Sequence, residues 1–187
     1  MKQESMPRYV LRITVVLLCI AIVVAGLLAF VNRVTAPVIA AATEERTMEA
    51  IRQVLPGEAY TVLTEFADET GLVSTVYENE TGYAVEVRPS GFDGAITMMV
   101  GVDREGAVLG FTVISHTETS GLGAVAASSN SAGEAFRGQF VGVTGAAAVT
   151  KDGGEIDAIT NATITSRAVC DGINAALACV EGLRGVG

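Results

Sequence analysis

The chain begins with an unbroken apolar stretch. Ile13 to Val31 holds 19 residues without a charge, and only Thr14 and Gly26 interrupt its apolar side chains. As a helix rising about 1.5 Å per residue, it would span roughly 28 Å, close to the hydrocarbon thickness of a bilayer. A secretory signal has a shorter apolar core, of about 7–15 residues, followed by a cleavage site of small residues. Because Asn32 and Arg33 follow the stretch here, the pattern favours an uncleaved transmembrane helix over residues 13–31.

Basic residues before this helix predict its orientation. Lys2, Arg8 and Arg12 precede it, so three of the 12 basic residues but only one of the 21 acidic residues, Glu4, lie on that side. The positive-inside rule then predicts that residues 1–12 are cytoplasmic. The remainder of the chain is predicted to lie outside the cytoplasmic membrane.

Helical spacing resumes after the apolar stretch. Apolar residues recur at helical intervals between Val38 and Leu55, and Pro37 suits a first helical turn. Pro56-Gly57 then ends the pattern. We predict that residues 32–56 form a stalk, or the first helix of a domain that occupies residues 57–187.

The middle of the chain has the alternation and turn signals of β-structure. The predicted strands are Leu72–Tyr77, Tyr83–Val87, Ala95–Val102 and Ala107–Ser115. The last two flank Asp103-Arg104-Glu105-Gly106, a hairpin turn with Gly at its end. Gln139–Thr144 is a candidate for a further strand.

Helices are predicted around these strands. Ser129–Phe136 carries Ser and Asn cap candidates for a short helix, and Ala168–Leu183 places its apolar residues on one helical face. Strands in succession, with helices at both ends, predict an α+β fold with an antiparallel sheet and flanking helices.

Composition excludes several functions. The 187 residues carry a net charge of −9, and a chain this acidic is repelled by phosphate backbones, so we expect no nucleic-acid partner. One His and three Cys exclude a multi-His or Cys-based metal site and a disulfide scaffold. Cys19 lies in the apolar stretch, while Cys170 and Cys179 are nine residues apart on the last helix, too far to be bridged. We expect all three to be inert.

A run of hydroxyl side chains precedes the last helix. Residues 157–167 read DAITNATITSR, with four hydroxyls within seven residues. One interpretation is a loop in which Thr or Ser caps the helix. The other is a phosphate site, because a helix N-terminus presents free N–H groups and the positive end of its dipole.

The same residues carry a family resemblance. Asp157-x-x-Thr160-Asn161-Ala162-Thr163 resembles Asp-x-x-(Ser/Thr)-Gly-Ala-Thr, the flavinylation motif of FMN-binding domains. In that family a flavin transferase uses FAD to attach FMN to the final Thr through a phosphoester, which implies Thr163 here. Asn161 replaces the usual Gly, and Asn tolerates the left-handed backbone that such a turn requires.

Further blocks resemble the family in the same order. Gly91-Phe92-Asp93-Gly94 and the strand after it are similar to its Gly-Tyr-x-Gly segment, residues 116–123 to its His-x-Glu-Thr-Pro-Gly-Leu-Gly segment, and Phe136–Gly142 to its Phe-x-x-Gln-Phe-x-Gly segment. Together with the N-terminal apolar stretch, this set resembles the G subunits of Rnf electron transport complexes.

The resemblance implies a second set of flavin contacts. His116 and Glu118 are two residues apart, so they share one side of a strand and are candidates for an acid–base pair or an ion pair. Gly121-Leu122-Gly123 permits close backbone approach. In this family the segment is expected near the flavin, so we predict that it supplies backbone donors and one apolar contact rather than a catalytic dyad.

The resulting hypothesis is an electron-carrying subunit of a membrane complex. The resemblance implies covalent FMN on Thr163, other Rnf subunits as partners, and coupling of ferredoxin–NAD redox chemistry to ion movement. The chain shows no NAD or ferredoxin motif, so we do not expect it to be a complete enzyme. The alternative is a membrane-anchored extracytoplasmic binding module without a redox role, in which the Thr-rich segment only caps a helix.

Overall fold

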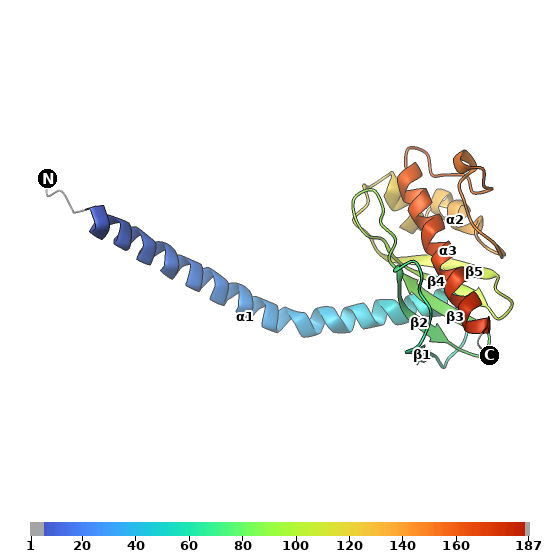
Figure 1. Cartoon of the computed structure of the whole chain (residues 1–187), viewed down its shortest axis with the longest axis horizontal. Coiled ribbons are helices and arrows are strands. Elements are labelled where there is room, and N and C mark those ends of the chain that lie inside the picture. The colour runs from blue at the N-terminus through green and yellow to red at the C-terminus, as the bar shows by residue number, and fades with distance from the viewer. Residues whose placement is uncertain (1–5, 186–187) are drawn as a thin grey trace. The chain divides into compact units, whose positions relative to one another are not determined.

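The computed structural model describes residues 6–185, and it divides into two units, with a boundary between Glu45 and Arg46. Helix α1 (Met6–Val54) forms the described part of the first unit, residues 6–45, and its last residues, 46–54, belong to the second unit. By length and composition α1 is suited to crossing a membrane (Figure 1). The hydroxyl of Thr14, a polar group in the apolar stretch, donates to the Val10 carbonyl at 3.0 Å and is satisfied within the helix.

The two helices predicted for this region form one. Pro37, predicted to sit in a first turn, lies inside α1. A proline removes one backbone donor but its fixed φ is compatible with a helix, so it does not oblige the chain to stop. Near it, the Thr35 hydroxyl donates to the Val31 carbonyl at 2.9 Å. The helix ends at Val54, close to the predicted stop at Pro56-Gly57.

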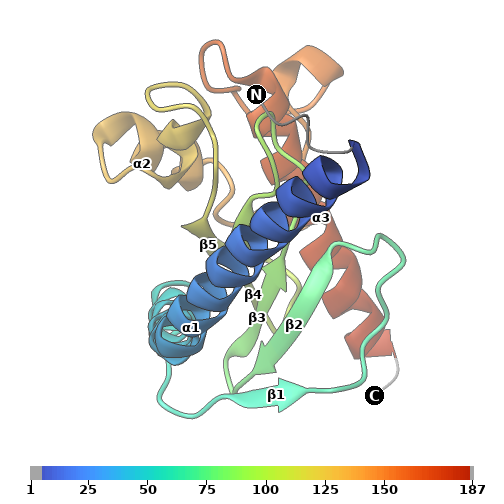
Figure 2. The same ribbon diagram turned by 90° about the vertical axis from the view of Figure 1, so that its left-hand side faces the viewer.

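The second unit is built on a five-stranded antiparallel sheet whose strands follow chain order (Figure 2). The strands are β1 (Thr61–Leu63), β2 (Val73–Glu78), β3 (Gly82–Val87), β4 (Thr97–Asp103) and β5 (Val108–Ser115). The four predicted strands and the α+β class are confirmed, with bounds shifted by one or two residues. The edge strand β1 was not predicted, because three residues are too few to show an alternation.

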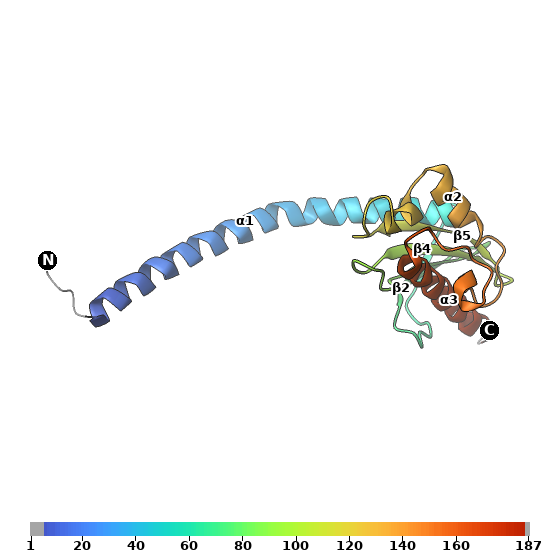
Figure 3. The same cartoon turned by 90° about the horizontal axis from the view of Figure 1, so that it is seen from above.

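Helices cover both faces of the sheet, as Figure 3 shows from above. On one face Val85, Val87 and Val100 pack against α3 (Thr163–Gly185). On the other face, Ala84 and Met99 pack against the end of α1, residues 50–54, and against Leu55 just after it. Because successive strand residues point to opposite faces, this alternation is what places one helix on each side.

The segment between β5 and α3 holds three short helices. These are η1 (Gly123–Ala127), α2 (Ser131–Gly138) and η2 (Thr150–Asp152). The predicted short helix is confirmed as α2, where Asn130 caps the N-terminus by accepting from the Gly133 N–H at 2.8 Å.

Two predictions for this segment need correction. The strand predicted at Gln139–Thr144 is wrong: the residues form turns, and Gly142 has a left-handed φ of 84° that extended backbone does not allow. The last helix begins at Thr163, five residues before the predicted start at Ala168. Thr163 therefore lies in the first turn of α3 rather than in a loop.

Candidate functional site

The site lies at the N-terminal end of α3, where a tight turn leads into the helix. Asn161 has a φ of 61°, the only positive value outside glycine among the described residues, so the Asn in the place of Gly adopts the left-handed conformation expected for it. The Ala162 N–H donates to the Ile159 carbonyl at 2.9 Å and closes the turn. The Ser166 hydroxyl donates to the Ala162 carbonyl and accepts from the Ile159 N–H, both at 3.0 Å, which ties the turn to the helix.

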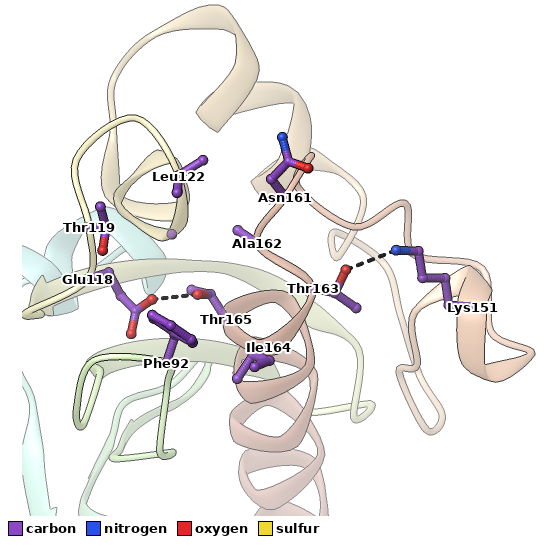
Figure 4. A pocket seen from close by; sticks show the side chains of 11 residues that line it. Phe92, Glu118, Thr119, Leu122, Lys151, Asn161, Ala162, Thr163, Ile164 and Thr165 are labelled. Atoms are coloured by element: carbon purple, nitrogen blue, oxygen red, sulfur yellow. Dashed lines mark hydrogen bonds between the residues drawn. The ribbon is translucent and has the colours of Figure 1, made fainter.

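The four hydroxyls of this segment have different environments. Thr165 and Ser166 are 1% and 0% exposed and have buried partners, whereas Thr160 is exposed and Thr163 is half-buried. The Thr163 Oγ1 accepts a hydrogen bond from the Lys151 Nζ at 3.1 Å (Figure 4). Thr163 is thus the hydroxyl that is both accessible and beside a cation.

Thr163 borders a pocket of about 380 Å³, within the range of small-molecule sites. The pocket lies between the start of α3 and two loops, the one before β4 and the one after β5 (Figure 4). Its lining residues are Phe92, Glu118, Thr119, Leu122, Gly123, Lys151, Asn161, Ala162, Thr163, Ile164 and Thr165. Three of the apolar members, Phe92, Leu122 and Ile164, are exposed.

Glu118 forms the buried wall of the pocket. Its Oε2 accepts from the Thr165 hydroxyl at 2.5 Å and its Oε1 accepts from the Asp93 N–H at 3.1 Å. A Cβ on Gly123 would lie 2.2 Å from the Glu118 Oε2, and one on Gly91 would lie 2.3 Å from the Oε1. The two glycines therefore let both loops close on the carboxylate, which is 6% exposed.

His116 and Glu118, candidates for an acid–base or ion pair that we interpret instead as part of a flavin-contacting segment, have different surroundings in the structure. β5 ends at Ser115, so His116 and Glu118 lie in the loop beyond it. The Glu118 carboxylate contacts Thr165 and Asp93, while the buried Nδ1 of His116 has no hydrogen-bond partner among the described residues. This loop does supply Leu122 and Gly123 to the pocket, whereas His116 does not line it.

The predicted motif residues line three neighbouring openings. Asn161, Ala162 and Thr163 line the pocket of 380 Å³. Asp157 and Thr160 border a neighbouring cleft of about 410 Å³, which Asn161, Thr163 and Lys151 also line. The Asp157 backbone is held by the Gln139 side chain, which accepts from its N–H at 2.7 Å and donates to its carbonyl at 3.2 Å. Gly121 lines a third cleft, of about 560 Å³, with Asp157 and Thr160.

Several lining residues were not among the predicted site residues. They are Phe92, Thr119, Lys151, Ile164 and Thr165. The sequence did offer a reason to consider Lys151, because Lys2 is the only other lysine of the chain. For Thr165 the sequence offered no such reason, since its buried environment depends on Glu118, 47 residues earlier.

Comparison with known proteins extends these observations. Residues 91–178 match the family described as FMN-binding domain, and residues 1–54 match the RnfG N-terminal region. The chain is 33% identical to the G subunit of the ion-translocating oxidoreductase complex of Methanosarcina acetivorans, over 93% of this chain and 96% of the relative. It is 32% identical to the G subunit of the Na(+)-translocating ferredoxin:NAD(+) oxidoreductase complex of Acetobacterium woodii, over 94% of each chain.

The fold and the site together define an FMN-binding domain that follows a long N-terminal helix. More specifically, the chain belongs to the family of the G subunits of ion-translocating oxidoreductase complexes, the Rnf complexes. With its apolar helix α1, membership of this family indicates a membrane-anchored protein.

Proposed function

We propose that this chain is an electron-transfer subunit of an Rnf complex and that it carries FMN as a phosphoester on Thr163. The partners are the other subunits of the complex, which couples ferredoxin–NAD redox chemistry to ion movement. The observation that carries the proposal is the environment of Thr163. It is the one hydroxyl of the motif that lines the apolar pocket and is also neither fully buried nor held by a buried partner.

The residues of the pocket suit FMN in two parts. The exposed apolar side chains of Phe92, Leu122 and Ile164 suit a flat aromatic ring system. The start of α3 and the Lys151 ammonium suit a phosphate, because both present positive charge and N–H donors at Thr163. FMN would supply the redox chemistry by accepting and releasing electrons, while the chain holds it in place.

Attachment requires a flavin transferase with FAD as the donor. The Thr163 Oγ1 forms a bond to the phosphorus of the FMN half of FAD, and the bond from that phosphorus to the oxygen of AMP breaks. AMP leaves, and the hydroxyl proton passes to a base of the transferase. The cleft bordered by Asp157 and Thr160 opens next to Thr163 and is where we expect the transferase to bind the motif.

We further propose that the FMN-binding domain lies outside the cytoplasm. The support is the basic flank of the apolar stretch, in which Lys2, Arg8 and Arg12 face a single acid. A covalent tether is useful there, because a dissociable flavin would be lost. Protease added to intact spheroplasts should digest the domain, and digestion only in inverted vesicles would reverse the orientation.

The test of the attachment site is a set of single substitutions. The full chain is co-expressed with a competent flavin transferase, and covalent flavin is measured by in-gel fluorescence after denaturation and by peptide mass mapping. Thr163→Ala should abolish the flavin, because an ester needs a hydroxyl. Thr144→Ala, which removes an exposed hydroxyl outside the motif and outside both openings at Thr163, should keep flavin on Thr163 and serves as the control.

Two outcomes would contradict the proposal. Full fluorescence of Thr163→Ala, or FMN mapped to Thr160 or Thr165, would refute the site. A wild-type chain that acquires no FMN beside an active transferase would refute the redox function and favour a binding module without a flavin.

A further inference from the structure

Lys151 is a single cation placed at the hydroxyl that the proposed function uses. The chain has two lysines, Lys2 and Lys151, and the Lys151 Nζ donates to the Thr163 Oγ1 at 3.1 Å (Figure 4). We propose that Lys151 binds the phosphoryl group carried by Thr163 as its counter-charge, and that it orients the Thr163 hydroxyl before transfer. This inference rests on the proposed function and assigns the residue that recognises the phosphate.

The turn that carries Lys151 is braced against α3. Arg167 donates from its Nε and Nη2 to the two carboxylate oxygens of Asp152, at 2.6 and 2.7 Å. This hydrogen bonding lowers the pKa of the Asp152 carboxyl below its usual value. Lys151 and Asp152 thus contact Thr163 and Arg167, which are four residues apart and lie on one face of the helix. The Lys151 ammonium is therefore positioned by a turn that is bonded to α3.

Close backbone packing and hydrogen bonds constrain this turn. Gly153 ends η2 with a left-handed φ of 86°. A Cβ on Gly154 would lie 2.0 Å from the Ala148 carbonyl oxygen, so the chain passes too closely there for a side chain. The Ile156 N–H donates to the same carbonyl at 3.1 Å, and Val149 pairs with Ile156 in a parallel bridge.

Charge makes Lys151 the residue of the pocket best suited to an anion. A phosphate esterified on two sides keeps one negative charge at neutral pH. Among the pocket-lining residues the ionisable side chains are Glu118 and Lys151, and the chain as a whole carries −9. Without Lys151, the phosphoryl group would share the pocket with a carboxylate and no cation.

The hydrogen bond also sets the direction of the Thr163 hydroxyl. An ammonium group has donors and no acceptor, so the Thr163 Oγ1 accepts from Lys151. Its own proton then points away from Lys151, available to the base that removes it during transfer. One side chain therefore orients the acceptor before transfer and neutralises the phosphoryl group afterwards.

Lysine-selective acetylation tests the contact directly, because the described residues contain a single lysine. Full-length chain is purified in detergent with and without prior flavin loading, treated with an acetylating reagent, and analysed by peptide mass spectrometry with Lys2 as the internal reference. A charge-assisted contact should slow acetylation of Lys151 about three- to tenfold in the loaded chain. Thr163→Val, co-expressed with the transferase, should react at least as fast as the unloaded chain, because it carries neither the flavin nor the hydroxyl that Lys151 contacts.

Variants of Lys151 test its role in loading, at limiting transferase and short times. Lys151→Gln should load FMN on Thr163 about tenfold more slowly, whereas Lys151→Arg, which keeps the charge, should stay within about threefold of wild type. Arg184→Gln removes the same charge from an exposed position at the other end of α3 and should load normally. Unfolding midpoints of all three should stay within about 2 °C of wild type, because the altered side chains are exposed.

The outcomes separate this inference from the proposed function. Loaded wild type in which Lys151 reacts as in the unloaded chain, or Lys151→Gln that loads at the wild-type rate, would overturn the role of Lys151 and leave the site at Thr163 intact. A wild-type chain that acquires no flavin would overturn both.

Discussion

Two threonines in one helical turn should respond in opposite ways to the same substitution. Thr163 and Thr165 both lie in the first turn of α3, but Thr163 is half-buried beside an exposed lysine, whereas Thr165 is 1% exposed and donates to the buried Glu118. Valine keeps the branched shape of threonine and a similar helix propensity, and it differs only in having a methyl group in place of the hydroxyl. Thr165→Val should therefore destabilise the domain and keep the flavin, while Thr163→Val should lose the flavin and keep its stability.

The environments give the magnitudes. Removing the Thr165 hydroxyl leaves the buried Glu118 Oε2 without its donor, and hydrogen bonds to charged groups contribute about 1.5–3 kcal/mol. Removing the Thr163 hydroxyl breaks a contact with an exposed ammonium, worth less than about 1 kcal/mol. With an unfolding entropy of about 0.3 kcal/mol/K for about 140 residues, the melting temperature should fall about 5–10 °C for Thr165→Val and less than about 3 °C for Thr163→Val.

The assay is calorimetry of the full-length chain in detergent, paired with in-gel flavin fluorescence. Both variants are made without the transferase for the melting temperatures and with it for loading. A domain with about 5–15 kcal/mol of stability survives either change, so loading of Thr165→Val reports on Thr163 rather than on folding. Equal melting temperatures for the two variants would show that the buried bond to Glu118 does not stabilise the domain, and loss of flavin from Thr165→Val would show that the two hydroxyls are not independent.

Three further predictions use other features of the fold. Gly123→Ala places a Cβ 2.2 Å from the buried Glu118 carboxylate and should cost about 1–3 kcal/mol, whereas Gly138→Ala, with nothing within 4 Å, should be neutral or stabilising in chemical denaturation. Burial raises the pKa of the Cys170 and Cys179 thiols to about 11, so at pH 8 both should react with a thiol reagent about a hundredfold more slowly than in the unfolded chain. The unfolded thiols lose their protons near pH 9, whereas the buried thiols keep theirs until about pH 11. The contribution of the two thiols to the free energy of unfolding is therefore fully present below pH 9 and is lost as the pH rises towards 11. Asn161→Gly should load flavin as well as wild type and change the free energy of unfolding by less than about 1 kcal/mol. Gly adopts the left-handed φ without strain, but it has more conformational entropy in the unfolded chain. Loss of loading would show that the turn needs the Asn side chain.

The sheet was predictable because its signal is local. In β3 and β4 the side chains alternate between two buried faces, and this period of two can be read in a few consecutive residues. Gln139–Thr144 has a similar apolar content but forms turns, because the geometry at Gly142 and the hydrogen bonds of Val108 to Gly142 and Val143 depend on where β5 lies. A local pattern therefore identified strands that pair with their neighbours in sequence and failed where the partner was remote.

The resemblance of residues 157–163 to the flavinylation motif determined which hydroxyl to consider, since the order of Asp157, Thr160, Ala162 and Thr163 can be read in the chain itself. The apolar stretch likewise determined the anchoring helix through its length and lack of charge. Only the tertiary structure decided that the Glu118 carboxylate binds the Thr165 hydroxyl and not the His116 side chain. It also decided that Lys151 is the cation at Thr163. These two contacts join residues that are 47 and 12 positions apart in the sequence. Such residues meet only when the loops before β4, after β5 and before α3 pack against one another, and no periodicity in the sequence encodes that packing.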